Sequence, residues 1–331
     1  MKSIILRCTL MLALGFTLPV MAAEEAATQR DVEITYSCLI EDIPAGTRHV
    51  DLWLPVASDT DGQTVSKTEI IKPANGTINT EEQYGNRIFH VRFEGPFAEV
   101  AKLEAELRYE IHRTAIDIQA AKEIQTGGEA AALTSYATYL SPNRLIPIDG
   151  RIDTIAKELG LNPEEPMETG RKIYDYLIDE MEYNWLAEGA GTGDVLWACD
   201  SKTGDCTDYN SLFLALCRSQ GIPADHVFGF PIRSTKDKGR IPSFHCAAQF
   251  YVKGVGWVPV DPSEADKHPE SRDYLFGSQS ASYMLFSHGR DIDLVPKQQG
   301  PPLNLFIHPY VEVDGEIHEE MKYRVMFENL K

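Results

Sequence analysis

Residues 204–224 read GDCTDYNSLFLALCRSQGIPA, and this stretch predicts a helix from Cys206 to Gln220. Gly221 supplies a stop signal directly after it. The apolar side of the helix is marked by residues at helical spacing: Leu212, Phe213 and Leu216. The pattern therefore places a cysteine in the first turn of an amphipathic helix.

A cysteine at this position is favoured as a reactive thiolate. The N-terminus of a helix carries roughly half a positive charge, which favours a thiolate over a thiol. The free backbone N–H groups of the first turn can also hold an oxyanion. A buried structural cysteine would nevertheless satisfy the same pattern, so Cys206 needs partners before it indicates a reaction.

Residues 244–265, FHCAAQFYVKGVGWVPVDPSEA, predict two strands joined by the turn Lys253-Gly254-Val255. A three-residue loop pairs Val252 with Gly256, so that His245 faces Ser263 and Asp261 is its diagonal neighbour on the same face. Diagonal neighbours are about 7–8 Å apart at the backbone, within reach of an imidazole and a carboxylate. A four-residue loop would place the two side chains on opposite faces.

Cysteine, histidine and carboxylate together are the parts of a thiol acyl-transfer site. Here Cys206 would be the nucleophile, His245 the base and Asp261 the group that holds the imidazole tautomer. Separately, the histidine could be a core residue and the Asp261-Pro262 step a turn. The combination favours catalysis.

Three segments resemble the core motifs of the transglutaminase-like superfamily: the two quoted above and IYDYLIDEMEYNW at residues 173–185. The resemblance covers roughly residues 170–265. It implies a papain-like α+β core of the kind found in transglutaminases, cysteine proteases and peptide N-glycanases, with Cys206, His245 and Asp261 as the catalytic residues. Cys246-Ala247-Ala248 stands where family members often carry an aromatic residue.

The resemblance also implies a second oxyanion donor from an upstream side chain, and three candidates stay open: Tyr183, Trp185 and Trp197. Each could instead be a packing aromatic. Of the other cysteines, Cys217 is interpreted as a core residue and Cys246 as pointing to the sheet face opposite His245. Cys199 is the cysteine that could form a regulatory disulfide with Cys206.

Residues 31–118 alternate at period two and predict an antiparallel β-sandwich. The predicted organisation is a β-sandwich domain at 23–118, a linker at 119–140 and a transglutaminase-like catalytic domain at 141–331. The C-terminal part of that domain is predicted to form a β hairpin turning at Asp314-Gly315. The fold class is therefore α+β.

The chain of 331 residues has 43% hydrophobic and 24% charged residues and a formal charge of −19, which argues against nucleic acid as a partner. Residues 1–22 combine Lys2 and Arg7 with an uncharged run and predict a cleaved signal peptide, hence a periplasmic or secreted protein. No later stretch predicts an integral membrane segment. Without a CxxC pair, neither a metal nor a cofactor is expected.

The expected function is thiol-dependent acyl transfer at an amide bond of an extracytoplasmic peptide or protein, as a protease or amidase or as a protein-glutamine acyltransferase. Hydrolysis is favoured over amine transfer because residues 186–205 and 231–243 are interpreted as open loops without an amine tunnel. The alternative is a non-catalytic scaffold that uses the papain-like core as a recognition surface.

Overall fold

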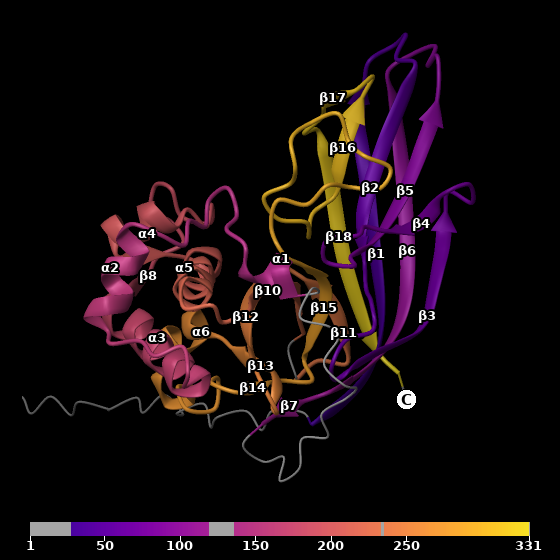
Figure 1. Ribbon diagram of the computed structural model, residues 1–331. Coiled ribbons are helices and arrows are strands. Elements are labelled where there is room, and N and C mark those ends of the chain that lie inside the picture. The colour runs from indigo at the N-terminus through magenta and orange to yellow at the C-terminus, as the bar shows by residue number, and fades with distance from the viewer. Residues whose placement is uncertain (1–27, 119–135, 233–234, 331) are drawn as a thin grey trace, which may run out of the picture.

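The computed structural model describes residues 28–118, 136–232 and 235–330. The predicted signal peptide at 1–22 and most of the predicted linker lie outside these ranges. In the described part of the chain, no helix combines the length and apolarity needed to cross a bilayer. Figure 1 shows a group of helices at one end and long strands at the other, with a smaller sheet between them.

The long strands form two five-stranded sheets with antiparallel pairing throughout. The first has the order β11 (Lys238–Ile241), β18 (Met321–Asn329), β1 (Gln29–Ile43), β6 (Ala101–Thr114), β3 (Gln63–Lys72). The second has the order β17 (Glu316–Ile317), β16 (Tyr310–Val313), β2 (His49–Val56), β5 (Arg87–Glu94), β4 (Thr77–Thr80).

The two sheets share one apolar core, as the alternating pattern predicts. Every second residue of β1, from Val32 to Ile40, is buried, and the alternate residues Val50, Leu52 and Leu54 of β2 join the same cluster. Alternate side chains of a strand point to opposite faces, so each sheet presents an apolar face to the other. This is the sandwich expected from residues 31–118.

The C-terminal strands complete this sandwich. The turn predicted at Asp314-Gly315 joins β16 to the short strand β17, and β16 also pairs with β2. The alternating residues 321–327, expected within the same hairpin, instead belong to β18, which lies between β1 and β11 in the first sheet. The pairing thus joins residues from both ends of the described chain. The domain boundaries at 118 and 140 remain predictions.

The third sheet has four antiparallel strands and carries the second half of the fold. Its order is β13 (Gly256–Val260), β12 (His245–Val252), β10 (Ala224–Pro231), β15 (Tyr283–His288). Two small pairs accompany it: β7 (Ile116–Asp117) with β14 (Ser278–Gln279), and β8 (Glu182–Tyr183) with β9 (Thr203–Gly204).

Helices pack on this third sheet around a core of their own (Figure 1). They are α1 (Ala137–Leu140), α2 (Arg151–Glu158), α3 (Pro166–Glu180), α4 (Val195–Ser201), α5 (Cys206–Ser219) and α6 (Pro262–Lys267), followed by a 3₁₀ turn at Pro269–Ser271. All but the last residue of α5 is buried, because the other helices and β12 surround it. Sequence analysis anticipated α5 and part of α3. It was wrong to treat residues 186–205 and 231–243 as open loops, since they contain α4 and β11.

The sandwich core continues to the start of α5. Phe230 of β10 and Phe286 of β15 pack against Tyr36 of β1 with ring centroids 5.7 and 6.3 Å apart. Cys206 and Cys246 belong to the same apolar cluster as these rings. The sandwich therefore packs against strands β10 and β15 of the third sheet.

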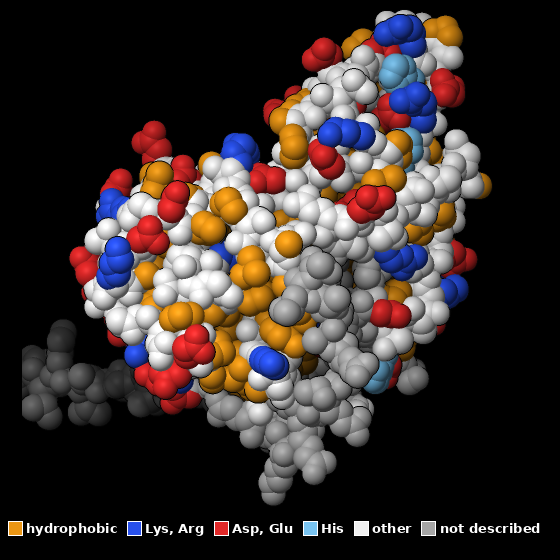
Figure 2. All heavy atoms as spheres, in the orientation of Figure 1, with side chains coloured by type: hydrophobic (Ala, Val, Ile, Leu, Met, Phe, Trp, Pro, Cys, Tyr) orange, Lys and Arg blue, Asp and Glu red, His pale blue; other side chains and the backbone are white. Residues whose placement is uncertain are grey.

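Charged side chains of both signs are interspersed over the face shown in Figure 2. On this face the acidic excess of the chain is not gathered into one patch.

Candidate active site

Two aspartates, Asp205 and Asp208, cap the N-terminus of helix α5. The Asp205 carboxylate accepts a hydrogen bond from the Thr207 N–H at 2.7 Å, and the Asp208 carboxylate accepts one from the Asp205 N–H at 2.9 Å. This reciprocal pair is a capping box, which fixes where the helix starts. Within the described residues the Cys206 N–H makes no hydrogen bond, so this donor is available to a ligand.

Asp208 also holds the glycine-rich loop that precedes α4. Its two carboxylate oxygens accept hydrogen bonds from the N–H groups of Gly191 and Gly193, each at 2.8 Å. Both glycines have positive φ, which residues with a Cβ rarely adopt. Burial raises the pKa of Asp208 to about 6, against the lowering effect of these N–H donors. Sequence analysis missed this residue, although three glycines within residues 189–193 were the available signal.

The hairpin of β12 and β13 has the predicted register. Val252 pairs with Gly256, and the pairing continues to Ala248 with Val260. There it ends, because Asp261 caps helix α6 and accepts a hydrogen bond from the Glu264 N–H at 3.0 Å. His245 therefore does not face Ser263 in a ladder as expected.

The side chains of His245 and Asp261 nevertheless meet. Nε2 of His245 lies 2.5 Å from Oδ2 of Asp261. The other carboxylate oxygen, Oδ1, accepts a hydrogen bond from the Ser263 hydroxyl at 2.9 Å. The carboxylate is thus held in place by α6. The other imidazole nitrogen, Nδ1, lies 3.9 Å from Oε1 of Glu264.

Three thiol and imidazole groups at this point perturb one another. A hydrogen bond from Cys246 lowers the pKa of Cys206 to about 6; burial opposes this shift and a hydrogen bond to His245 adds to it. Burial alone would lower the pKa of His245, but the negative charge of Asp261 raises it well above its usual value. The arrangement favours a thiolate on Cys206 beside an imidazolium on His245.

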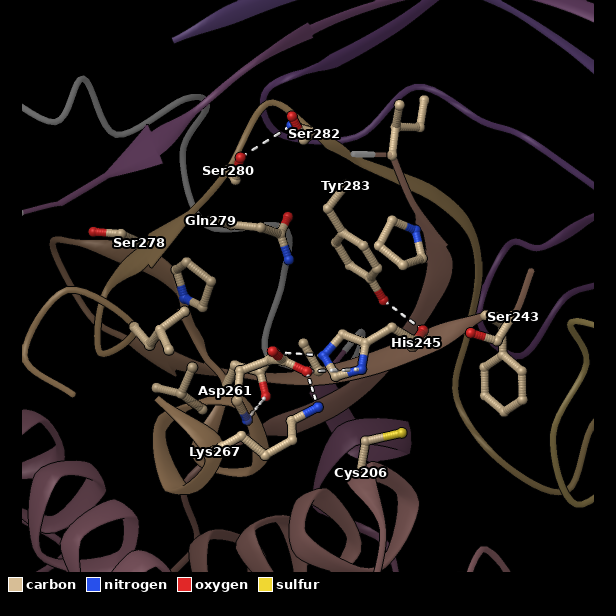
Figure 3. A pocket seen from close by; sticks show the side chains of 18 of the residues that line it. Cys206, Ser243, His245, Asp261, Lys267, Ser278, Gln279, Ser280, Ser282 and Tyr283 are labelled. Atoms are coloured by element: carbon tan, nitrogen blue, oxygen red, sulfur yellow. Dashed lines mark hydrogen bonds and ion pairs between the residues drawn. The ribbon is translucent and has the colours of Figure 1, made fainter. Parts of the chain in front are cut away.

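Tyr283 of β15 orients His245. Its hydroxyl donates to the His245 backbone carbonyl at 2.8 Å, and its ring lies 5.8 Å from the imidazole, nearly edge-on (Figure 3). Sequence analysis missed this residue because β15 pairs with β10, far from the quoted motifs.

A pocket of about 500 Å³ opens beside these residues, and Cys206, His245 and Asp261 all line it (Figure 3). Its lining includes the apolar residues Ile232, Phe244 and Leu275 and three prolines. It also includes hydroxyl and amide groups, from Ser243, Ser278, Gln279, Ser280 and Ser282. The pocket can therefore take a group with an apolar part while remaining accessible to water.

The three oxyanion candidates lie in different places. Tyr183 lines the pocket together with Cys206. Trp185 is 67% exposed, and Trp197 packs against the helical core; neither lines the pocket. Burial and the neighbouring Cys206 raise the pKa of Tyr183, so its hydroxyl stays a donor.

The cysteines of the described residues are all free. Cys217 is fully buried in the helical core, as expected. Cys199 belongs to that same core, whereas Cys206 belongs to the core shared with the sandwich. Among the residues that the structure describes, no cluster of three or more His, Cys, Asp or Glu side chains could hold a metal ion.

Comparison with known proteins finds similarity to one family and to one relative. Residues 153–262 match the family model of the transglutaminase-like superfamily. An uncharacterised protein of Haemophilus influenzae is 31% identical over 210 residues, covering 54% of this chain. The chain spans 57% of the length of that relative.

A solved structure shares the architecture at low identity. A candidate cysteine protease from Cytophaga hutchinsonii aligns over 92% of both chains with a TM-score of 0.57 and 15% identity. The periplasmic domain of TgpA from Pseudomonas aeruginosa aligns over 75% of this chain and 91% of that one, with a TM-score of 0.36 and 13% identity. The fold over nearly the whole chain is thus that of a known structure. Over residues 153–262 the chain is thus similar to the transglutaminase-like superfamily.

Proposed function

We propose that Cys206, His245 and Asp261 form the catalytic triad of a thiol-dependent acyl transferase that cleaves amide bonds. The observation that carries the proposal is the 2.5 Å contact between His245 Nε2 and Asp261 Oδ2 beside a cysteine whose thiolate is favoured. A recognition scaffold has no need of a thiolate whose neighbouring imidazole is paired with a buried carboxylate.

The reaction follows from the positions of the donors. The Cys206 thiolate attacks the amide carbon, and the Cys206 N–H and the Tyr183 hydroxyl stabilise the oxyanion. His245, protonated and aligned by Asp261, gives its proton to the nitrogen as the C–N bond breaks, leaving a thioester on Cys206. Neutral His245 then takes a proton from a water molecule as the water oxygen attacks the thioester; the C–S bond breaks, the acid is released, and the Cys206 thiolate and the His245 imidazolium are restored.

Water is the proposed acceptor. Water is present at tens of molar and an amine at millimolar, so amine transfer needs an advantage of about 10⁴, or roughly 5–6 kcal/mol, from a dry and specific site. The serine and glutamine side chains that line the pocket favour hydration instead. We therefore favour a protease or amidase over a protein-glutamine acyltransferase, acting on an extracytoplasmic peptide or protein.

Peptide libraries with and without a labelled primary amine at 1 mM test this function, with acyl-enzyme trapping on Cys206 followed by mass spectrometry. We expect a thioester adduct on Cys206 and hydrolysed products in excess. Predominant amine incorporation would favour a transglutaminase. Failure to trap any adduct, together with Cys206 alkylating no faster than free cysteine near pH 6, would favour the scaffold.

A further inference from the structure

A second hollow, of about 360 Å³, adjoins the pocket that holds Cys206. Pro242 and Ser243, in the segment between β11 and β12, line both hollows. From these two residues the second hollow extends along strand β18, where residues 321–325 line it. A peptide bound at Cys206 can therefore continue past Pro242 and Ser243 toward the sandwich.

The second hollow follows the edge of β18. Alternate side chains of a strand point to opposite faces, so a hollow on one face alone would contact every second residue, whereas here five consecutive residues line it. The ladder between β11 and β18 ends at Ile241 and Val325, and in the described chain no strand pairs with residues 321–324 on that side. Backbone N–H and C=O groups on such an edge can pair with an extended peptide.

Two arginines without an ionic partner lie beside this edge. Arg240 of β11 is opposite Met326, and Arg324 of β18 is opposite Ser37 of β1, so neither faces an acidic side chain across the sheet. Both arginines are exposed and line the hollow. Within the described residues, neither guanidinium makes an ion pair or a hydrogen bond.

The hollow is basic although the chain as a whole is acidic, with 50 Asp and Glu residues against 31 Lys and Arg. Its third basic residue, Lys322, is already paired with Glu41. Among the described residues that line the hollow, none is acidic. The charges of Arg240 and Arg324 are therefore available to an anionic ligand, at a strand edge that suits a peptide.

We propose that the substrate is an acidic peptide or protein segment, which binds in extended form along the free edge of β18 with Asp or Glu side chains against Arg240 and Arg324. The inference rests on the proposed function, because it concerns the part of the substrate to one side of the bond that Cys206 attacks.

The geometry of the strand sets the pattern of acidic residues. At about 3.3 Å a residue, the five residues 321–325 span about 13 Å, which matches four or five residues of an extended peptide. Arg324 and Met326 are two residues apart on β18, and Arg240 is opposite Met326, so the two guanidinium groups share one face of the sheet. We therefore expect acidic side chains at alternate positions of the peptide.

The binding test uses the Cys206→Ala variant of the full chain and two rhodamine-labelled octapeptides, one of alternating glycine and glutamate and one of alternating glycine and glutamine. Fluorescence anisotropy at low salt should show the glutamate peptide binding about five- to tenfold tighter. Adding Arg240→Gln and Arg324→Gln should remove most of this difference. Adding Arg48→Gln, which removes an exposed arginine outside both hollows, should leave it.

Cleavage by the active protein gives the second test. In peptide libraries, the cleaved bonds should have Asp or Glu enriched at alternate positions on one side, and the Arg240→Gln/Arg324→Gln double variant should lose this enrichment.

Equal affinities for the two octapeptides, a difference that persists in the double variant, or cleaved bonds without acidic enrichment would each overturn the inference. Since binding to Cys206→Ala needs no turnover, glutamate-selective binding by a protein that cleaves no peptide would count against the proposed function. Cleavage without acidic preference would count against this inference alone.

Discussion

Helix α5 carries a cysteine near each end, and the pKa values of the two thiols are shifted in opposite directions. Cys206 in the first turn has a pKa lowered to about 6, with Cys246 as its main donor and His245 as a second. Cys217 near the other end is surrounded by apolar side chains, and burial raises its pKa. Both thiols are buried, at 7% and 0% exposure, so burial alone does not decide reactivity. The hydrogen bonds that Cys206 makes at the start of the helix account for its lower pKa.

Two buried histidines on neighbouring strands also have pKa values shifted in opposite directions by their neighbours. His245 of β12 faces the carboxylate of Asp261, which raises its pKa. His226 of β10 is buried with its Nδ1 3.4 Å from the guanidinium of Arg290, and burial and that positive charge lower its pKa well below the usual value. Only the histidine with a carboxylate partner is suited to hold a proton and return it.

The largest expected effect separates the two cysteines. Cys206→Ala removes the nucleophile and should reduce amide cleavage to background, a loss of roughly 10⁴-fold or more, with little change in the melting temperature. Cys217→Ala should keep the activity and cost about 1–2 kcal/mol of stability through the cavity it leaves. Turnover and thermal unfolding of both variants check this, and full activity in Cys206→Ala would exclude a thiol mechanism.

The next effect concerns the carboxylate. Asp261→Asn keeps the shape but no longer stabilises the imidazolium, so kcat should fall by about 10²–10⁴-fold. Asp225→Asn is the matched control, because Asp225 accepts from His288 Nδ1 at 2.9 Å on the same sheet, outside the pocket that holds Cys206. Equal losses in the two variants would point to a general effect on the sheet. If Asp261→Asn unfolds while its native fraction keeps full turnover, the role of Asp261 is to cap helix α6 and not to assist catalysis.

A smaller effect is expected at the oxyanion. Tyr183→Phe removes one donor and should lower kcat by about 10–10²-fold with little change in KM. Trp185→Phe, at an exposed position away from the pocket, should leave both constants unchanged. Steady-state kinetics on one peptide substrate distinguish the two, and unchanged kcat in Tyr183→Phe would remove it from the site.

The smallest effect is a difference in alkylation rate near neutral pH. Because the pKa of Cys206 is lowered, its thiolate population rises as the pH rises through about 6 and is nearly complete at pH 7. Free cysteine titrates near 8.5, so we expect Cys206 to react roughly tenfold faster at pH 7. Iodoacetamide labelling with peptide mapping measures this, and Cys217 should stay unlabelled in the native protein. A Cys206 midpoint above pH 8 would contradict the assigned environment.

Sequence reasoning succeeded where the determining contacts are local. The register of β12 and β13 follows from a three-residue turn, and the start of α5 follows from its cap and apolar spacing. It missed Asp208, Tyr283 and the contact between Cys206 and Cys246. These depend on how α5, β12 and β15 are brought together in space, which no spacing within one segment encodes.

The position of β18 shows the same limit on a larger scale. An alternating pattern at residues 321–327 predicts a strand, but the pattern does not identify β1 as the strand with which it pairs. Similarly, helix α6 begins directly after β13 because the Asp261 carboxylate caps it, so Ser263 does not face His245 as expected.

The pairing of β1 with β18 has a consequence for the order of folding. Val32 pairs with Asn329, so the whole candidate site lies within a loop that this one ladder closes. Closing so long a loop is entropically costly until the segment within it has gained structure of its own, and high contact order slows folding. During synthesis, β1 and β6 are finished long before β18 emerges from the ribosome. Until then the first sheet would expose an open edge at β1, and association with other chains at that edge would compete with folding.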